Sequence, residues 1–212
     1  MKVFIIGAGG RVGTALATKL AADGHEVFAG VHHVADQFAG TDIHVVAYDL
    51  HASVDEQAKQ LGDVDAVYFV AGSRSKDLLQ TDAFGVVQAG KAAKQNGIKR
   101  FVLLSSLFAT RPEKWNTAFL AKITDYNIAK FFADEWLIDH SDLDYTILQP
   151  GLLQDDQPAT GKIKVNVEDT GANPIPDVVT VLATLLEKPN TIGKVITMYT
   201  GDTPISDALD EI

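Results

Sequence analysis

The first sixteen residues constrain the fold of this chain more than any other stretch. They read MKVFIIGAGGRVGTAL: an apolar run over residues 3–6, then four glycines, then apolar residues at helical spacing. This order predicts a buried strand, a glycine turn and the start of a helix. The unpaired N–H groups and the dipole of a helix N-terminus attract a phosphate, and glycine lets it approach the backbone closely. We therefore expect residues 1–16 to bind the pyrophosphate of a dinucleotide.

The spacing of the glycines fits G-x-x-G-x-x-G, because position 12 is Val12 where the commoner G-x-G-x-x-G pattern requires glycine. A glycine pattern alone is also typical of an ordinary strand-to-helix turn. The strand before it and the helix after it favour nucleotide binding. The predicted contacts to the cofactor from this turn are Gly7, Gly9, Gly10, Arg11, Val12 and Gly13.

Charge and composition exclude several classes of partner. The net charge of −10 over 212 residues argues against nucleic acid, which needs a basic face. The apolar runs are too short to cross a membrane, so we expect no membrane partner. The chain has no cysteine, which is typical of a reducing cytoplasm, and no spacing typical of metal ligands. We expect a cytoplasmic protein without a metal, either a monomer or a homodimer.

Strand-like and helix-like segments alternate along the rest of the chain. Strands are predicted over residues 25–31, 43–47, 65–70, 100–104 and 144–150, with helices over 53–61, 77–95 and 124–139. This alternation predicts an α/β fold, a doubly wound parallel sheet of the Rossmann-like kind, in one domain over residues 1–212. Residues 150–212 are expected to complete the sheet and to cover the substrate side of the cleft, with a strand over 162–167, a helix over 175–186 and a strand over 194–199.

The end of the second strand bears on the choice between NAD and NADP. A carboxylate there would bind the ribose 2′-hydroxyl of NAD, but the strand ends on Val31 and His32, and the next acid is Asp36. A 2′-phosphate would meet no repulsion, and Arg11 and His32 are placed to bind it. We therefore expect NADP rather than NAD, and we interpret the neighbouring His33 as a solvated loop residue.

Two further strand ends are candidates for cofactor contacts. Asp49 and Leu50 follow the third strand, where an adenine ring would lie, although Asp49 is equally placed to cap the helix over 53–61. Ala71 and Gly72 follow the fourth strand and keep the crevice open through their small size.

The candidate chemistry lies on the helix over 124–139. Tyr126 and Lys130 are four residues apart and therefore share a helical face. The ammonium is expected to lower the pKa of the phenol from ~10 toward neutrality, so that the tyrosine exchanges a proton with a carbonyl or alcohol oxygen. Ser106, at the end of the fifth strand, is placed to bind the same oxygen. The alternative is a surface helix with an incidental pair.

Together these motifs resemble the short-chain dehydrogenase/reductase superfamily, specifically its small atypical NAD(P)H-binding members. The resemblance covers nearly the whole chain and rests on GAGGRVG, Asp49-Leu50, Ala71-Gly72, LLSS at 103–106, YNIAK at 126–130 and DYTILQPG at 144–151. It implies that Tyr126 is the general acid/base, Lys130 its partner and a ribose ligand, and Ser106 the residue that orients the substrate. It also implies that Ser105 and Pro150 lie near the cofactor.

Three positions depart from the pattern of that family. Gln149 stands where relatives usually have arginine, and Asp82 stands about where many have an active-site asparagine. His32 takes the place of the basic residue that usually follows the second strand. The first two departures concern the substrate, and the third concerns how tightly NADP is held.

The leading functional hypothesis is an NADP-dependent oxidoreductase acting on a small carbonyl/alcohol substrate that the sequence does not identify. One alternative is a nucleotide-sugar epimerase, for which the part after residue 150 is short. Another is a redox-sensing regulatory protein that binds NAD(P)H without turnover.

Overall fold

The computed structural model describes residues 1–33, 36–117 and 119–212. Its main sheet has nine strands in the order β11-β8-β10-β6-β5-β4-β1-β2-β3, and a small sheet pairs β7 with β9. The strands are β1 (Lys2–Ile6), β2 (Glu26–Val31), β3 (His44–Ala47), β4 (Ala66–Phe69), β5 (Arg100–Leu104), β6 (Asp144–Pro150), β7 (Leu152–Gln154), β8 (Lys162–Val165), β9 (Ala172–Pro174), β10 (Lys194–Thr200) and β11 (Thr203–Pro204).

The strands in the middle of the sheet are parallel and buried, as their continuous apolar runs predict. Val3 in β1 is paired with Val27 on one side and with Ala66 on the other. β8 runs antiparallel to β10, and β11 antiparallel to β8, so the sheet is mostly rather than wholly parallel. The prediction of a single Rossmann-like α/β domain is confirmed.

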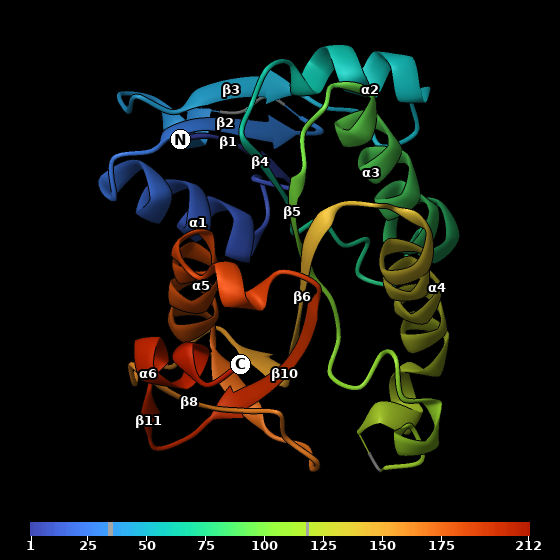
Figure 1. The fold of residues 1–212 in the computed structure, drawn as a ribbon, viewed down its shortest axis with the longest axis vertical. Coiled ribbons are helices and arrows are strands. Elements are labelled where there is room, and N and C mark those ends of the chain that lie inside the picture. The colour runs from blue at the N-terminus through green and yellow to red at the C-terminus, as the bar shows by residue number, and fades with distance from the viewer. Residues whose placement is uncertain (34–35, 118) are drawn as a thin grey trace.

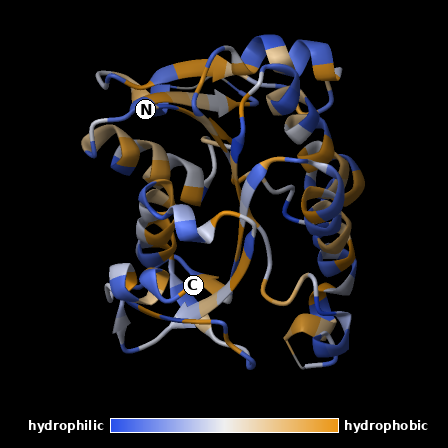
Figure 2. Ribbon diagram, in the orientation of Figure 1, coloured by the Kyte–Doolittle hydropathy of each residue, from blue (hydrophilic) through white to orange (hydrophobic). Residues whose placement is uncertain are grey.

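Helices cover both faces of the sheet (Figure 1). They are α1 (Arg11–Ala22), α2 (Val54–Leu61), α3 (Gly85–Gln95), α4 (Thr124–His140), α5 (Ile175–Thr184) and α6 (Ile205–Asp210). One core lies between the sheet and α1, α5 and α6, and the other between the sheet and α2, α3 and α4. Figure 2 shows hydrophobic residues along the strands and, mixed with hydrophilic ones, along the helices, and the buried ones pack between the sheet and the helices. Each helix therefore buries an apolar stripe against the strands.

Three segments differ from the sequence prediction. The apolar residues over 43–47 predict a buried third strand, but β3 is an exposed strand that lies at the edge of the sheet beside β2. The helix expected over 77–95 begins as a π-helix, η2 (Leu78–Phe84), before α3. The polar stretch over residues 152–161 predicts a loop, but residues 152–154 form β7, which pairs with β9. Among the residues described, none of the helices combines the length and apolarity needed to cross a bilayer.

Candidate functional site

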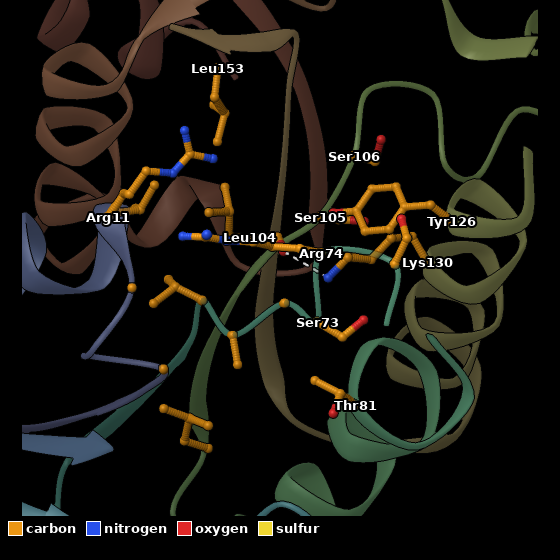
Figure 3. Close-up of a pocket in the computed structure, with 18 of the residues that line it drawn as sticks. Arg11, Ser73, Arg74, Thr81, Leu104, Ser105, Ser106, Tyr126, Lys130 and Leu153 are labelled. Carbon is orange, nitrogen blue, oxygen red and sulfur yellow. Dashed lines mark hydrogen bonds between the residues drawn. The ribbon is translucent and has the colours of Figure 1, made fainter. Parts of the chain in front are cut away.

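A cavity of about 790 Å³ opens at the carboxyl ends of the central strands (Figure 3). The chain runs from β1 to β2 on one side and from β4 onward on the other, so the cavity lies where the strand order reverses. Open α/β sheets bind their ligands at this point. The cavity is lined by residues from Ile6 to Gly171, which come from most of the length of the chain.

The glycine turn forms a cradle at one end of the cavity. Gly7 has φ +91°, and a Cβ there would lie 2.6 Å from the Cα of Ala71, so only glycine fits. Gly10 is the N-cap of α1 and has no side chain to bond the first helical N–H groups, and it lines the cavity together with Arg11 and Val12. The turn provides backbone donors and room for a pyrophosphate.

The cavity lining includes five of the six residues predicted from this turn: Gly7, Gly9, Gly10, Arg11 and Val12. Gly13 is the exception, and its contact with the cofactor stays a prediction. It is buried, and a Cβ there would collide with the Gly7 carbonyl oxygen and lie 2.8 Å from the Cα of Ala8. Gly13 therefore allows α1 to pack closely on the turn.

The end of β2 places several polar side chains at the cavity. Arg11 and His32 line it as predicted, and His33 and Gln37 line it too. His33 is an exposed residue of the loop after β2, as predicted, and its Nε2 lies 2.9 Å from Nδ1 of His32. The Arg11 guanidinium forms an ion pair with Asp155, which the sequence did not reveal because the two residues are far apart in the chain.

Asp49 and Leu50 also line the cavity. Oδ1 of Asp49 accepts a hydrogen bond of 2.9 Å from the backbone N–H of His51, and helix α2 is capped by Ser53, whose hydroxyl accepts from the N–H of Glu56. The alternative that Asp49 caps this helix is therefore wrong. Its contact with adenine stays a prediction.

Tyr126, Lys130 and Ser106 meet in the cavity, so the tyrosine–lysine pair is not an incidental surface pair (Figure 3). Lys130 Nζ lies 5.7 Å from the centroid of the Tyr126 ring and donates to the carbonyl oxygen of Leu104 at 3.4 Å. Its side chain is 1% exposed and has Asp82 Oδ1 at 4.0 Å as counter-ion. The phenol of Tyr126, the buried ammonium of Lys130 and the hydroxyl of Ser106 therefore line the same cavity.

The structure corrects the prediction that the pKa of Tyr126 falls toward neutrality. Burial raises the pKa of Tyr126, and the carboxylates of Asp82 and Asp134 raise it as well, which together outweigh the lowering by Lys130. The helical spacing of Tyr126 and Lys130 is visible in the sequence, but the effect of the two buried carboxylates on the phenol is not. Tyr126 is therefore protonated at neutral pH, which suits proton donation to a carbonyl oxygen.

The two serines that end β5 have different partners. Ser106 Oγ donates to Asn127 Oδ1 at 3.2 Å, whereas Ser105 Oγ donates to Asp134 Oδ2 at 2.8 Å. Both line the cavity, so Ser105 joins the cavity to a buried carboxyl group. Asn127 and Asp134 were missed from the sequence, although Asp134 follows Lys130 by one further helical turn on the face that carries Tyr126.

Asp134 is fully buried, and burial raises its pKa to about 7 despite hydrogen bonds from Ser105 and Gln149 and the charge of Lys130. Gln149 Nε2 donates to Asp134 Oδ2 at 2.9 Å. Gln149 is itself fully buried and does not line the cavity. This departure from the family pattern therefore acts on a buried carboxyl group, behind the wall of the cavity.

Asp82 organises the loop after β4. It is fully buried in η2 and accepts hydrogen bonds from the backbone N–H of Ser73, at 3.1 Å, and from the Ser73 hydroxyl. π-Helical segments often occur at functional sites.

Ala71 and Gly72 line the cavity as predicted, and so do the next three residues, which the sequence analysis missed: Ser73, Arg74 and Ser75. Their position directly after Gly72 was the available signal.

Pro150 lines another wall, with five residues of the segment after it: Gly151, Leu152, Leu153, Thr170 and Gly171. Phe119, Leu120 and Ile123 close the end of the cavity near Tyr126.

In the ranges 1–33, 36–117 and 119–212, no three His, Asp or Glu side chains come together in a way that could hold a metal ion.

Comparison with known proteins gives a consistent result. Residues 7–189 match the model of a family described as NAD(P)H-binding. The crystal structure of the oxidoreductase ylbE from Lactococcus lactis has a TM-score of 0.96 at 41% identity, covering 100% of this chain and 96% of that one.

Two further relatives match along their whole length. The Bacillus subtilis protein named "Uncharacterized sugar epimerase YhfK" is 34% identical, with 100% of both chains covered. The yeast (Saccharomyces cerevisiae) UPF0659 protein YMR090W is 31% identical, covering 100% of this chain and 99% of that one. The similarity therefore includes the segment after residue 150 as well as the nucleotide-binding half.

Proposed function

The chain belongs to the NAD(P)H-binding family, as an atypical member of the short-chain dehydrogenase/reductase kind, and on that premise we propose that it is an NADP-dependent oxidoreductase. Its substrate would be a small carbonyl compound or the corresponding alcohol. The observation that carries this proposal is the meeting of Tyr126, Lys130 and Ser106 in the cavity whose other end is the glycine cradle.

The described residues fit a dinucleotide, because the cradle has no side chain where a pyrophosphate would lie and the helix start supplies N–H donors. When bound, the nicotinamide would supply or accept the hydride. The neutral phenol of Tyr126 would give its proton to the substrate oxygen, and the Ser106 hydroxyl would orient that oxygen. Lys130, held by Asp82, would bind the ribose and keep a positive charge beside the phenol.

The preference for NADP over NAD is supported by the groups around the end of β2. Arg11, His32, His33 and Gln37 line the cavity there, and all four are able to donate hydrogen bonds to a phosphate. Arg11 is also paired with the carboxylate of Asp155.

Tyr126→Phe tests the proposal, because it removes only the hydroxyl. We expect the reduction rate to fall about 10²- to 10⁴-fold, which is the usual contribution of a positioned acid, while the Kd for NADPH stays within twofold. Tyr145→Phe, which removes a hydroxyl outside the cavity lining, is the matched control and should keep the parental rate. NADPH consumption and NADPH fluorescence titrations measure the two quantities. A parental rate in Tyr126→Phe would exclude the tyrosine as the acid.

A nucleotide-sugar epimerase is the second candidate, favoured by the name of the Bacillus subtilis relative. Such an enzyme would interconvert two sugars without net NADPH consumption. A redox sensor would bind NADPH tightly and turn over neither a sugar nor a carbonyl compound, so the same parental assays distinguish the three functions.

A further inference from the structure

The charges around the cavity are opposite to those of the chain as a whole. The chain carries a net charge of −10, yet the cavity is lined by three cations, Arg11, Arg74 and Lys130, and by one acid, Asp49. Arg11 is paired with Asp155 and Lys130 with Asp82. Within the part of the chain that the structure describes, Arg74 has no ion-pair partner.

Arg74 is held at the cavity by its backbone. Arg74 has φ +52° and Ser75 has φ +63°, so two consecutive residues with side chains adopt the left-handed conformation that glycine favours. Such strain persists only where the surroundings enforce it, and it is typical of ligand-binding segments. Here Ser73 is fixed by two hydrogen bonds to the buried Asp82, which anchors the loop one residue before the arginine.

The direction of the side chain separates Arg74 from the proton-transfer groups. Figure 3 shows it extending across the cavity from the side of Lys130 toward the side of Arg11, away from the Tyr126 ring. Its guanidinium thus faces the region between the glycine cradle and the catalytic residues. This is the region that the phosphates of a dinucleotide would cross.

We propose that Arg74 is a cofactor-binding residue whose guanidinium binds the pyrophosphate from the side opposite the glycine cradle. This inference rests on the proposed binding of a nicotinamide dinucleotide. The cradle offers backbone N–H groups on one side of the pyrophosphate, and a planar guanidinium offers paired donors and a full charge to its remaining oxygens. Because NAD and NADP share the pyrophosphate, Arg74 would strengthen the binding of both equally, unlike a residue that binds the 2′-phosphate.

The test compares the Kd values of NADPH, NADH and ADP-ribose in the parent, Arg74→Ala and Arg74→Lys by isothermal titration calorimetry. Loss of a charged hydrogen-bonding partner should weaken all three ligands by the same factor, about 10- to 100-fold in Arg74→Ala, with an intermediate loss in Arg74→Lys. Lys76→Ala is the matched control, because it removes a positive charge from the same loop outside the cavity lining and should leave the Kd values unchanged. Circular dichroism verifies that each variant is folded. If Arg74→Ala is unfolded, the Kd values of Arg74→Lys are compared with those of the parent instead.

Other outcomes would overturn the proposal. Weakening of NADPH alone would place the guanidinium at the 2′-phosphate, and unchanged Kd values with a raised KM for an anionic carbonyl substrate would place it at the substrate. Unchanged cofactor affinity in Arg74→Ala with a parent that binds NADPH would refute this inference alone. A parent that binds none of the three ligands would refute the proposed function as well.

Discussion

At the scale of single residues, the protonation of the buried Asp134 carboxyl group makes the stability of the fold depend on pH. Its pKa is raised to about 7 by burial, whereas an unfolded aspartate titrates near 3.9. Below pH 4 both states hold the proton. Between pH 4 and 7 the unfolded chain releases it and the folded chain keeps it, so this group makes the fold less stable as pH rises.

Asp134→Asn should remove that pH dependence. The amide oxygen would still accept the hydrogen bonds from Ser105 and Gln149, but no proton would be lost on unfolding. Relative to the parent, the free energy of unfolding of the variant should rise by roughly 4 kcal/mol between pH 4 and pH 8, the equivalent of the pKa difference. Urea titrations at several pH values measure it, with Asp139→Asn on the exposed part of α4 as the control. A difference that does not vary with pH would mean that Asp134 is ionised in the folded protein.

Substitution of Gly13 should mainly affect stability, whereas substitution of Gly10 should mainly affect NADPH binding. Gly13→Ala places a methyl group against the backbone of Gly7 and Ala8 and should lower the free energy of unfolding by about 1–3 kcal/mol. A Cβ at Gly10 meets only the Gly7 carbonyl oxygen, at 3.3 Å, so Gly10→Val should fold, with a loss near 1 kcal/mol from a poorer N-cap. It should nevertheless lose NADPH binding, because its side chain would occupy the pyrophosphate site. Urea titrations and NADPH titrations on both variants separate the two roles. Normal NADPH affinity in Gly10→Val would show that this turn does not bind the pyrophosphate.

At the scale of elements, the ion pair between Arg11 and Asp155 joins the start of α1 to the loop after β7. Both side chains are about half exposed, at 51% and 48%, so the pair should contribute at most ~1 kcal/mol to stability. Its larger effect would be on ligand binding, because Asp155 competes with a cofactor phosphate for the Arg11 guanidinium.

Asp155→Ala should therefore tighten NADPH binding several-fold while shifting the melting temperature little. Arg11→Ala should weaken NADPH more than NADH, because the arginine is placed for the 2′-phosphate. Thermal melting and titrations with both cofactors test the pair, and Asp156→Ala is a control that keeps the ion pair. Weaker NADPH binding in Asp155→Ala would show instead that the ion pair holds the loop in its binding position.

The sequence was most informative where local patterns decide the structure. The strand–glycine–helix start, the buried parallel strands and the helical spacing of Tyr126 and Lys130 are local, and the structure confirms them. The raised pKa of Tyr126 and the burial of Gln149 could not be predicted, because they depend on side chains brought together from α4, β6 and η2. The exposure of β3 depends on its place at the sheet edge, which a run of apolar residues does not reveal.

At the scale of the whole molecule, the cavity requires nearly all of the fold. Its lining begins with Ile6 in the first strand and ends with Gly171, beside the small sheet of β7 and β9. Gly171 in turn lies against Tyr199 of β10, since a Cβ at that glycine would collide with the tyrosine ring. The wall that faces the glycine cradle thus depends on a strand formed by residues close to the carboxyl terminus.

The position of β10 has a consequence for synthesis on the ribosome. β10 lies between β6, which is made earlier and runs parallel to it, and β8, which joins the sheet only through β10 and β11. A growing chain can form the glycine turn and the sheet from β3 to β6, but it has no docking place for β8 until residues 194–200 have emerged. The cavity is therefore completed only after β10 has been made, and a tightly bound dinucleotide would mark those copies of the chain in which β10 has joined the sheet.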